Sequence, residues 1–220
     1  MTELDIAVEA YREYLSKNGT RLDFSNNILY DMCKNHLNHK DPDEIAGKIL
    51  IIGRTYAASI ERRKKDTDID NDSFYYDKVV GKMITIGDEL DKRIKALRES
   101  EKTIDDEISL VLQTHLMLTK AFNDISGLDK RSLASKYLHF HCPEKFFIYD
   151  SRSSSEIKKI VKKNRKQNFS RIYDTDTKYE DFVNRMLVFQ KKLLETNSIE
   201  DVTPRKLDSF LLYGTGNLRI

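Results

Sequence analysis

The sequence predicts an all-α fold, and three observations support that class. Apolar residues recur at the three- and four-residue spacing of a helix, as with Ile45, Ile49 and Ile52, and no strand pattern of comparable strength accompanies them. Only 3 prolines and 8 glycines interrupt the 220 residues. Hydrophobic residues make up 39% and charged residues 34% of the chain, which is typical of a globular helical protein rather than a disordered or fibrous one.

Residues that favour helix ends punctuate the chain. Thr2 is a suitable cap for a first helix that Asn18-Gly19 would end. Pro42 suits the first turn of a helix, and Thr103 with Asp106 three residues later resembles a capping box. We therefore expect loops over 64–76 and 164–178 and, in chain order, helices over 2–18, 25–37, 42–60, 79–97, 104–122, 130–141, from 150 onward, 179–194 and 203–214.

The chain contains no internal repeat and no low-complexity tract, and its predicted helices are joined by short connections. We therefore expect a single helical domain over 1–220, of one or two lobes. Residues 1–14 are acidic and amphipathic without the apolar core of a signal peptide, and no 18 apolar residues run together. These features predict a cytoplasmic protein with no membrane span. Cys33 and Cys142 lie in unrelated contexts and are expected to be free thiols.

Basic residues concentrate in one segment. Residues 151–172 carry one acid, Glu156, against eight basic side chains, those of Arg152, Lys158, Lys159, Lys162, Lys163, Arg165, Lys166 and Arg171. The segment has a local charge of +7, and since the whole chain has +2, the remainder has about −5. Such asymmetry predicts a surface that faces a polyanion, with DNA as the expected partner. A solvated helix face explains the same run and stays an alternative.

The candidate chemistry lies in the segment 125–152, ISGLDKRSLASKYLHFHCPEKFFIYDSR. On a helix that begins near residue 130, one face carries three polar side chains, those of Ser132, Lys136 and His139. Cys142-Pro143 ends that helix, and an aromatic extended run then leads to Asp150 at the start of another helix. A carboxylate held against apolar and aromatic walls can serve catalysis. A role for Asp150 as a helix cap explains the pattern equally well.

This segment resembles the active-site segment of the helix-hairpin-helix DNA glycosylases. Members of that superfamily have a glycine-rich hairpin, a helix, a run that contains proline or aromatic residues, and an aspartate that opens the next helix. Ser132 lies 18 positions before Asp150, a spacing similar to theirs, and the match covers about 28 of 220 residues. The segments 51–56 (IIGRTY) and 135–140 (SKYLHF) also look like those of an uncharacterised bacterial group related to the oxoguanine glycosylases.

The chain departs from this superfamily at the hairpin. A member's hairpin has two glycines that let backbone N–H groups approach a DNA phosphate, whereas only Gly127 is present here and Asp129 adds a repelling charge. Lys130 and Arg131 could compensate for that charge. No four-cysteine cluster follows the last helices, so the iron–sulfur cluster of some relatives is not expected. Bifunctional members carry a lysine where this chain, like the adenine-DNA glycosylases, has Ser132.

The resemblance implies a helix-hairpin-helix glycosylase-like helical array that binds DNA and hydrolyses the N-glycosidic bond of a damaged or modified base without a cofactor. Asp150 would stabilise the sugar cation, Ser132 would make the enzyme monofunctional, and Lys136 keeps a lyase role open. A flipped base would contact His139, Phe147 and Tyr149. The residues expected to bind nucleic acid are Lys130, Arg131, Arg152, Lys158, Lys159, Lys162, Lys163, Arg165 and Lys166.

Other functions remain open at this stage. The chain could be a non-catalytic DNA-binding or regulatory helical module, or a protein-interaction domain with no nucleic-acid role. No metal site is expected, because His139 and His141 fall at alternate helical positions that point apart. The acidic segment 66–77 matches a calcium loop in spacing, yet Asn71 stands where glycine is required.

Overall fold

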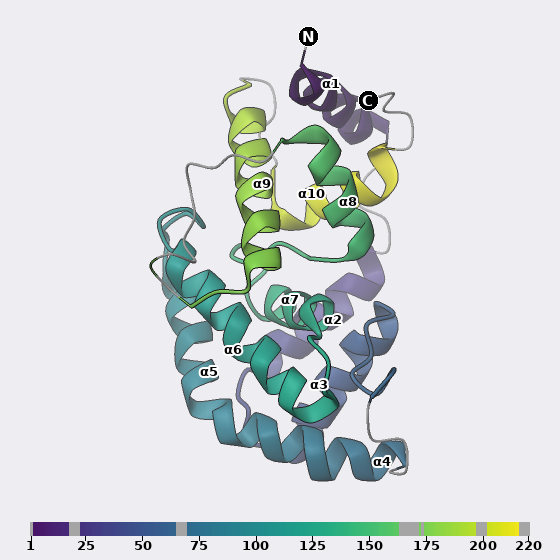
Figure 1. The fold of residues 1–220 in the computed structure, drawn as a ribbon, viewed down its shortest axis with the longest axis vertical. Helices are drawn as coiled ribbons and strands as arrows, with labels where there is room; N and C mark the ends of the chain where they lie inside the picture. The colour runs from purple at the N-terminus through teal and green to yellow at the C-terminus, as the bar shows by residue number, and fades with distance from the viewer. Residues whose placement is uncertain are drawn as a thin grey trace. The chain divides into compact units, whose positions relative to one another are not determined.

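The computed structural model describes residues 2–17, 23–64, 70–162, 172, 174–196 and 202–215. Every regular element in those ranges is a helix and none is a strand, which confirms the predicted all-α class (Figure 1). The elements are α1 (Glu3–Lys17), α2 (Asp23–Asn35), α3 (Pro42–Thr55), α4 (Asn71–Ser73), the π-helical η1 (Phe74–Val80), α5 (Gly81–Glu99), α6 (Ile108–Ser126), α7 (Arg131–His141), α8 (Ser151–Ile160), α9 (Thr177–Leu194), α10 (Pro204–Ser209) and the π-helical η3 (Phe210–Gly214). Within the described ranges, no helix has the length and apolar character that crossing a membrane requires.

The chain forms two compact units. Unit 1 consists of Met1–Asp23 together with Phe147–Ile220, and unit 2 consists of Phe24–Phe146. The helices α1, α8, α9 and α10 with η3 therefore belong to unit 1, and the helices from α2 to α7 belong to unit 2. Unit 2 is continuous in sequence, whereas unit 1 combines both ends of the chain.

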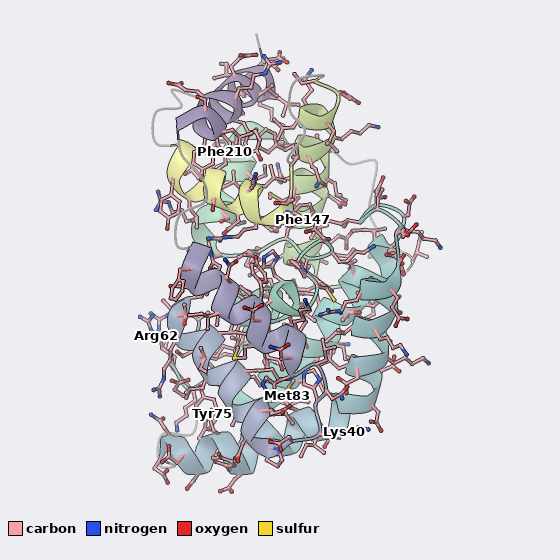
Figure 2. The ribbon with its side chains drawn as sticks, turned by 180° about the vertical axis from the view of Figure 1, so that it is seen from behind. Lys40, Arg62, Tyr75, Met83, Phe147 and Phe210 are labelled. Atoms are coloured by element: carbon pink, nitrogen blue, oxygen red, sulfur yellow. The ribbon has the colours of Figure 1, made fainter. Side chains whose placement is uncertain are left out.

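Helix α7 forms the core of unit 2. It packs against α3 and α6, and α5 lies along the other side of α6 (Figure 1). All nine residues from Leu133 to His141 are buried. Met83 of α5, labelled in Figure 2, is also fully buried. A helix that is enclosed on all sides usually carries apolar side chains only, and the polar residues of α7 are therefore the exceptional feature of this unit.

Aromatic rings hold unit 1 together. The Tyr11 ring of α1 meets the Phe189 ring of α9 edge-on, with centroids 6.3 Å apart, and the Phe210 ring of η3 with centroids 5.2 Å apart. Phe210 is labelled in Figure 2 and is fully buried. Because large rings bury much apolar surface and prefer such edge-to-face contacts, this cluster fixes α1, α9 and η3 against one another.

Several predicted helix starts are confirmed by their capping hydrogen bonds. Asp41 caps α3 through the Asp43 and Glu44 amides at 2.9 and 3.0 Å, with Pro42 in the first turn as expected. Thr203 caps α10 through the Lys206 amide. The reciprocal hydrogen bonds between Thr103 and Asp106 also form. They close a turn ahead of α6, however, and the helix itself begins at Ile108 rather than at residue 104.

The prediction of a helix over 42–60 is wrong at its end. Helix α3 ends at Thr55, and the chain turns back through Ala57, whose φ of 50° is left-handed. A Cβ on Gly53 would lie 3.0 Å from the Ser59 Cα, so this return segment packs directly on α3. Ile60 is fully buried without being helical. The helical spacing of Ile60 from the isoleucines before it therefore reflects burial in the core and not helical conformation.

The predicted loop over 64–76 is also wrong in part. Asp70 caps a helical stretch through the Ser73 amide at 3.0 Å, and α4 and η1 follow without a break. Residues 65–69 of this predicted loop lie outside the described residues. Of the predicted loop 164–178, residues 174–176 are non-helical, and α9 begins at Thr177.

One close approach in unit 2 can be tested through the glycines of its helices. A Cβ on Gly87 of α5 would lie 2.9 Å from the His39 carbonyl oxygen, whereas a Cβ on Gly47 of α3 would meet nothing within 4 Å. We expect Gly87→Ala to lower the free energy of unfolding by about 1–3 kcal/mol because backbone must move. Gly47→Ala should raise it by about 0.5–1 kcal/mol. Urea unfolding measures both, and equal effects would contradict the packing of α5 on His39.

Candidate functional site

A buried lysine on α7 is the first unusual feature of the segment predicted to carry chemistry. Lys136 is only 2% exposed, and its Nζ donates a hydrogen bond of 2.7 Å to the Ser132 Oγ. The same Nζ lies 5.6 Å from the centroid of the Tyr56 ring. Lysine is almost never fully buried unless it is paired, and both a hydroxyl oxygen and an aromatic face attract an ammonium group. The predicted pair Ser132 and Lys136 is thus brought together inside unit 2.

Residues from α2 and α7 pack around Tyr56, the residue after α3 that lies beside Lys136. The Tyr56 hydroxyl donates a 2.6 Å hydrogen bond to Asn26 Oδ1 on α2. Asn26 is 3% exposed, and its Nδ2 has no hydrogen-bond partner among the described residues. The Phe140 ring packs against Tyr56 at 5.4 Å and against Tyr30 at 4.9 Å. The sequence prediction gave no site role to these residues, because they come from segments far apart in the chain.

His139 is fixed in one tautomer. Its Nδ1 lies 2.8 Å from the Phe146 carbonyl oxygen and must donate to it, so its Nε2 accepts the 2.7 Å hydrogen bond from the Tyr30 hydroxyl. The ring is fully buried. Both nitrogens are therefore occupied within unit 2, and neither is available to hydrogen-bond a base.

Asp150 lies in unit 1, where it caps α8. Its Oδ1 accepts a 2.8 Å hydrogen bond from the Ser153 amide, which is the structural role that the sequence left open for it. Tyr149 is half-buried with its ring 5.2 Å from that of Phe182. Phe147 is fully buried, and its carbonyl accepts a hydrogen bond from the Tyr179 hydroxyl at 3.0 Å. The predicted site residues thus divide between the two units.

The turn between α6 and α7 is built around Gly127. This residue has a left-handed φ of 69°, and its amide bonds to the Asn123 carbonyl. Asp129 accepts hydrogen bonds of 2.8 Å from the Asn123 side chain and from Arg131. Lys130 donates to the carbonyls of Ser59 and Arg62, and burial lowers its pKa. Lys130 and Arg131, which were expected to bind a DNA phosphate, therefore contact backbone carbonyls and a carboxylate of unit 2.

The basic segment is exposed where it is described. Arg152, Lys158, Lys159 and Lys162 all point to solvent on or just after α8. Lys159 pairs with Glu156 at 2.7 Å, and Lys162 pairs with Glu3 at 2.9 Å. Exposed pairs of this kind contribute little stability and are easily exchanged for other anions. The remaining predicted DNA contacts lie outside the described residues, namely Lys163, Arg165 and Lys166.

A second buried polar network in unit 2 was not predicted. His39 Nδ1 donates to Asp91 Oδ1 at 2.5 Å, and its Nε2 accepts a 2.7 Å hydrogen bond from the Tyr137 hydroxyl. His39 and Tyr137 are 1% and 0% exposed. His39 is 52 positions from Asp91 and 98 positions from Tyr137 in the chain, so no pattern of sequence spacing predicts these contacts.

His141 extends this network and leaves one atom unsatisfied. Its ring stacks on His39 with centroids 5.6 Å apart, and its Nδ1 donates to the Tyr137 carbonyl at 2.8 Å. Its buried Nε2 has no hydrogen-bond partner within the described part of the chain. Burial, His39 and the nearby Lys48 ammonium lower the pKa of His141 well below its usual value, and burial also lowers the pKa of His39. Both rings are therefore held neutral.

The described residues contain no group of three or more histidine, cysteine, aspartate or glutamate side chains that could hold a metal ion. Cys33 and Cys142 are both buried and free. Burial raises the pKa of each thiol to about 12, which leaves both of them unreactive near neutral pH.

No family model, no curated protein and no solved structure matches this chain.

The two neutral histidines make stability depend on pH. Folded His39 and His141 resist protonation, whereas in the unfolded chain they take up protons below about the usual value of 6.5. The unfolded state then binds more protons, so the free energy of unfolding should fall from pH 7 to pH 5, by up to about 1.4 kcal/mol per pH unit for each ring. His141→Gln should flatten this dependence. Identical pH profiles for wild type and His141→Gln would contradict the assignment.

Proposed function

We propose that this chain binds DNA and hydrolyses the N-glycosidic bond of a damaged or modified base. The observation that supports this most is the order of elements around Asp150. A helical hairpin with the left-handed Gly127 leads into α7, a non-helical run follows, and Asp150 then opens α8. This is the order that the resemblance of the segment 125–152 to the helix-hairpin-helix glycosylases implies.

In this function Asp150 supplies negative charge. As the bond between C1′ and the base nitrogen breaks, the electron pair leaves with the base and the sugar becomes a cation. A fixed carboxylate stabilises that cation, and water adds to C1′ and loses a proton, which the departing base takes up. The Ser153 amide holds one oxygen of Asp150, which restricts how the carboxylate can turn.

Within unit 1, the aromatic residues before Asp150 would then serve the base. Ser132 has no amine, so no Schiff base forms at that position, and base excision without strand cleavage is expected. Of the three residues expected to contact an extruded base, Tyr149 is the most exposed, and stacking on its ring is the simplest contact. Buried free thiols suit a cytoplasmic location, where thiols stay reduced.

A non-catalytic DNA-binding module is the second candidate. Two observations favour it. Asp150 already has a structural role as a helix cap, and the hairpin cations Lys130 and Arg131 are engaged by carbonyls and by Asp129 rather than left for phosphate. The basic face of α8 would then be sufficient to bind DNA through its charge alone.

Replacing Asp150 separates these two candidates. Asn keeps the volume and can still cap α8 at a cost of a few tenths of a kcal/mol, but it carries no charge. We expect Asp150→Asn to slow base release by on the order of a hundredfold or more, while thermal stability and DNA affinity stay near wild type. The measurement is incubation with duplexes that carry different lesions, followed by alkali to reveal abasic sites.

The matched control is Asp176→Asn. Asp176 caps α9 in the same unit through the Lys178 and Tyr179 amides, so the same substitution there changes a cap without touching Asp150. Base release by this variant should equal that of wild type. If Asp150→Asn also retains full base release, or if no lesion is processed, the catalytic proposal fails and the DNA-binding module takes its place.

The basic segment 151–172 should make DNA affinity depend steeply on salt. The variant replaces Lys158, Lys159, Lys162 and Lys163 with Gln. In a plot of log association constant against log salt concentration, we expect its slope to be less steep than that of wild type, by roughly 0.9 for each lost phosphate contact. The control removes four exposed lysines from unit 2, namely Lys34, Lys40, Lys92 and Lys95. Fluorescence anisotropy with a labelled duplex measures both slopes. Equal slopes for the two variants would mean that the basic segment is solvated surface without DNA contacts.

A further inference from the structure

A buried polar chain links the first turn of α8 to α10 within unit 1. Ser153 uses its amide to hold Asp150 Oδ1 at 2.8 Å and its Oγ to donate to Asp208 Oδ1 at 3.1 Å. The second Asp208 oxygen accepts a 2.8 Å hydrogen bond from Arg205. Ser153 therefore hydrogen-bonds two carboxylates, the proposed catalytic one of Asp150 through its backbone amide and that of Asp208 through its hydroxyl.

Burial makes this arrangement costly. Ser153 is 0% exposed and Asp208 is 1% exposed, while the Arg205 side chain is 13% exposed. A buried ion pair loses much of its attraction to desolvation, and apolar residues of similar size often stabilise a fold as well or better. Stability alone therefore does not account for a carboxylate at position 208.

Asp208 is itself held firmly in place. Thr203 caps its helix, and the following η3 packs on α8 and on α1. Phe210 anchors η3 in the aromatic cluster of unit 1. A Cβ on Gly214 would lie only 2.4 Å from the Phe210 ring, so that ring packs directly against the Gly214 backbone. The π-helical turn next to Asp208 is of a kind often found near functional sites.

We propose that Asp208 is a positioning residue for Asp150, acting through Ser153. The inference rests on the proposed function, since it concerns the carboxylate that would stabilise the sugar cation. Asp208 fixes the Ser153 side chain, the side chain fixes the direction of the Ser153 amide, and the amide fixes the plane of the Asp150 carboxylate. Arg205 neutralises Asp208, so the second carboxylate adds no net charge beside the first. Catalytic groups need this kind of support because a displacement of about 1 Å can cost a hundredfold in rate.

Two variants disrupt the hydrogen bond between Ser153 and Asp208 from opposite sides. Asp208→Asn keeps the volume but offers a single acceptor to two donors, Ser153 and Arg205, and Ser153→Ala removes only the hydroxyl. We expect each to lower the single-turnover rate of base release about tenfold while the dissociation constant for DNA stays within twofold of wild type. The double variant should be no slower than the slower single variant, because both act on one chain of contacts. Ser153→Thr restores a hydroxyl and should recover most of the rate.

Two controls separate positioning from loss of stability. Ser209→Ala truncates the fully buried neighbour of Asp208, whose Oγ has no hydrogen-bond partner in the described residues. Asp181→Asn breaks a similar pair, the contact of 3.1 Å with Arg185 on α9. All rates are measured well below the unfolding temperature of each variant. Both controls should release base at the wild-type rate.

A measurement without substrate completes the test. Hydrogen exchange of the Ser153 amide, followed by nuclear magnetic resonance, reports its bond to Asp150, and Asp208→Asn should raise the exchange rate at least tenfold while Ser209→Ala leaves it unchanged. Unchanged exchange overturns the inference whether or not the protein is an enzyme. If Asp150→Asn abolishes base release but Ser153→Ala and Asp208→Asn release it normally, the inference alone fails. If Asp150→Asn has no effect, the proposed function fails instead.

Discussion

Unit 2 depends on one constraint, which is that α7 is enclosed along most of its length and yet carries polar side chains. Each buried polar group that lacks a partner costs about 1–3 kcal/mol, so the surrounding elements must supply partners at fixed places. They do so from α2, from the segment before α3, from α5 and from the turn after α7, through Tyr30, His39, Asp91 and the Phe146 carbonyl. The arrangement of these elements around α7 follows from those hydrogen bonds as much as from apolar packing.

An apolar helix would fill the same space without buried polar groups that need hydrogen-bond partners. A fold that keeps a lysine, two histidines and an unsatisfied imidazole nitrogen inside its central helix has accepted lower stability there. Proteins tend to break packing rules at places where function requires it. The polar interior of α7 is therefore an argument for a functional role that does not depend on any resemblance, and the ion pair of Asp208 makes a similar argument in unit 1.

Local features of the fold were predictable from the sequence, and distant ones were not. The start of α3 at Pro42, capped by Asp41, and the cap of α8 by Asp150 depend on neighbours within three residues, so the side-chain types there reveal them. The helix over 42–60 was extended too far because Ile60 is a core residue at helical spacing without being helical. The contact of His39 with Tyr137 spans 98 positions, and only the packing of the helices brings the two together. The same holds for Asn26 and Tyr56, which come from segments far from Ser132 and Lys136 in the chain.

The way the two units share the chain has a consequence for biosynthesis. Unit 2 occupies one continuous stretch, so a ribosome releases all of it before any residue from Phe147 onward. Helix α1 emerges earlier still, but the rings that cover Tyr11 belong to α9 and η3. At translation rates of about 5–20 residues per second, the chain between α1 and these rings takes roughly 10–40 s to make, and the apolar face of α1 stays open to solvent or to a chaperone for that time. Helix α1 thus precedes the other described helices in synthesis and is among the last of them to be buried.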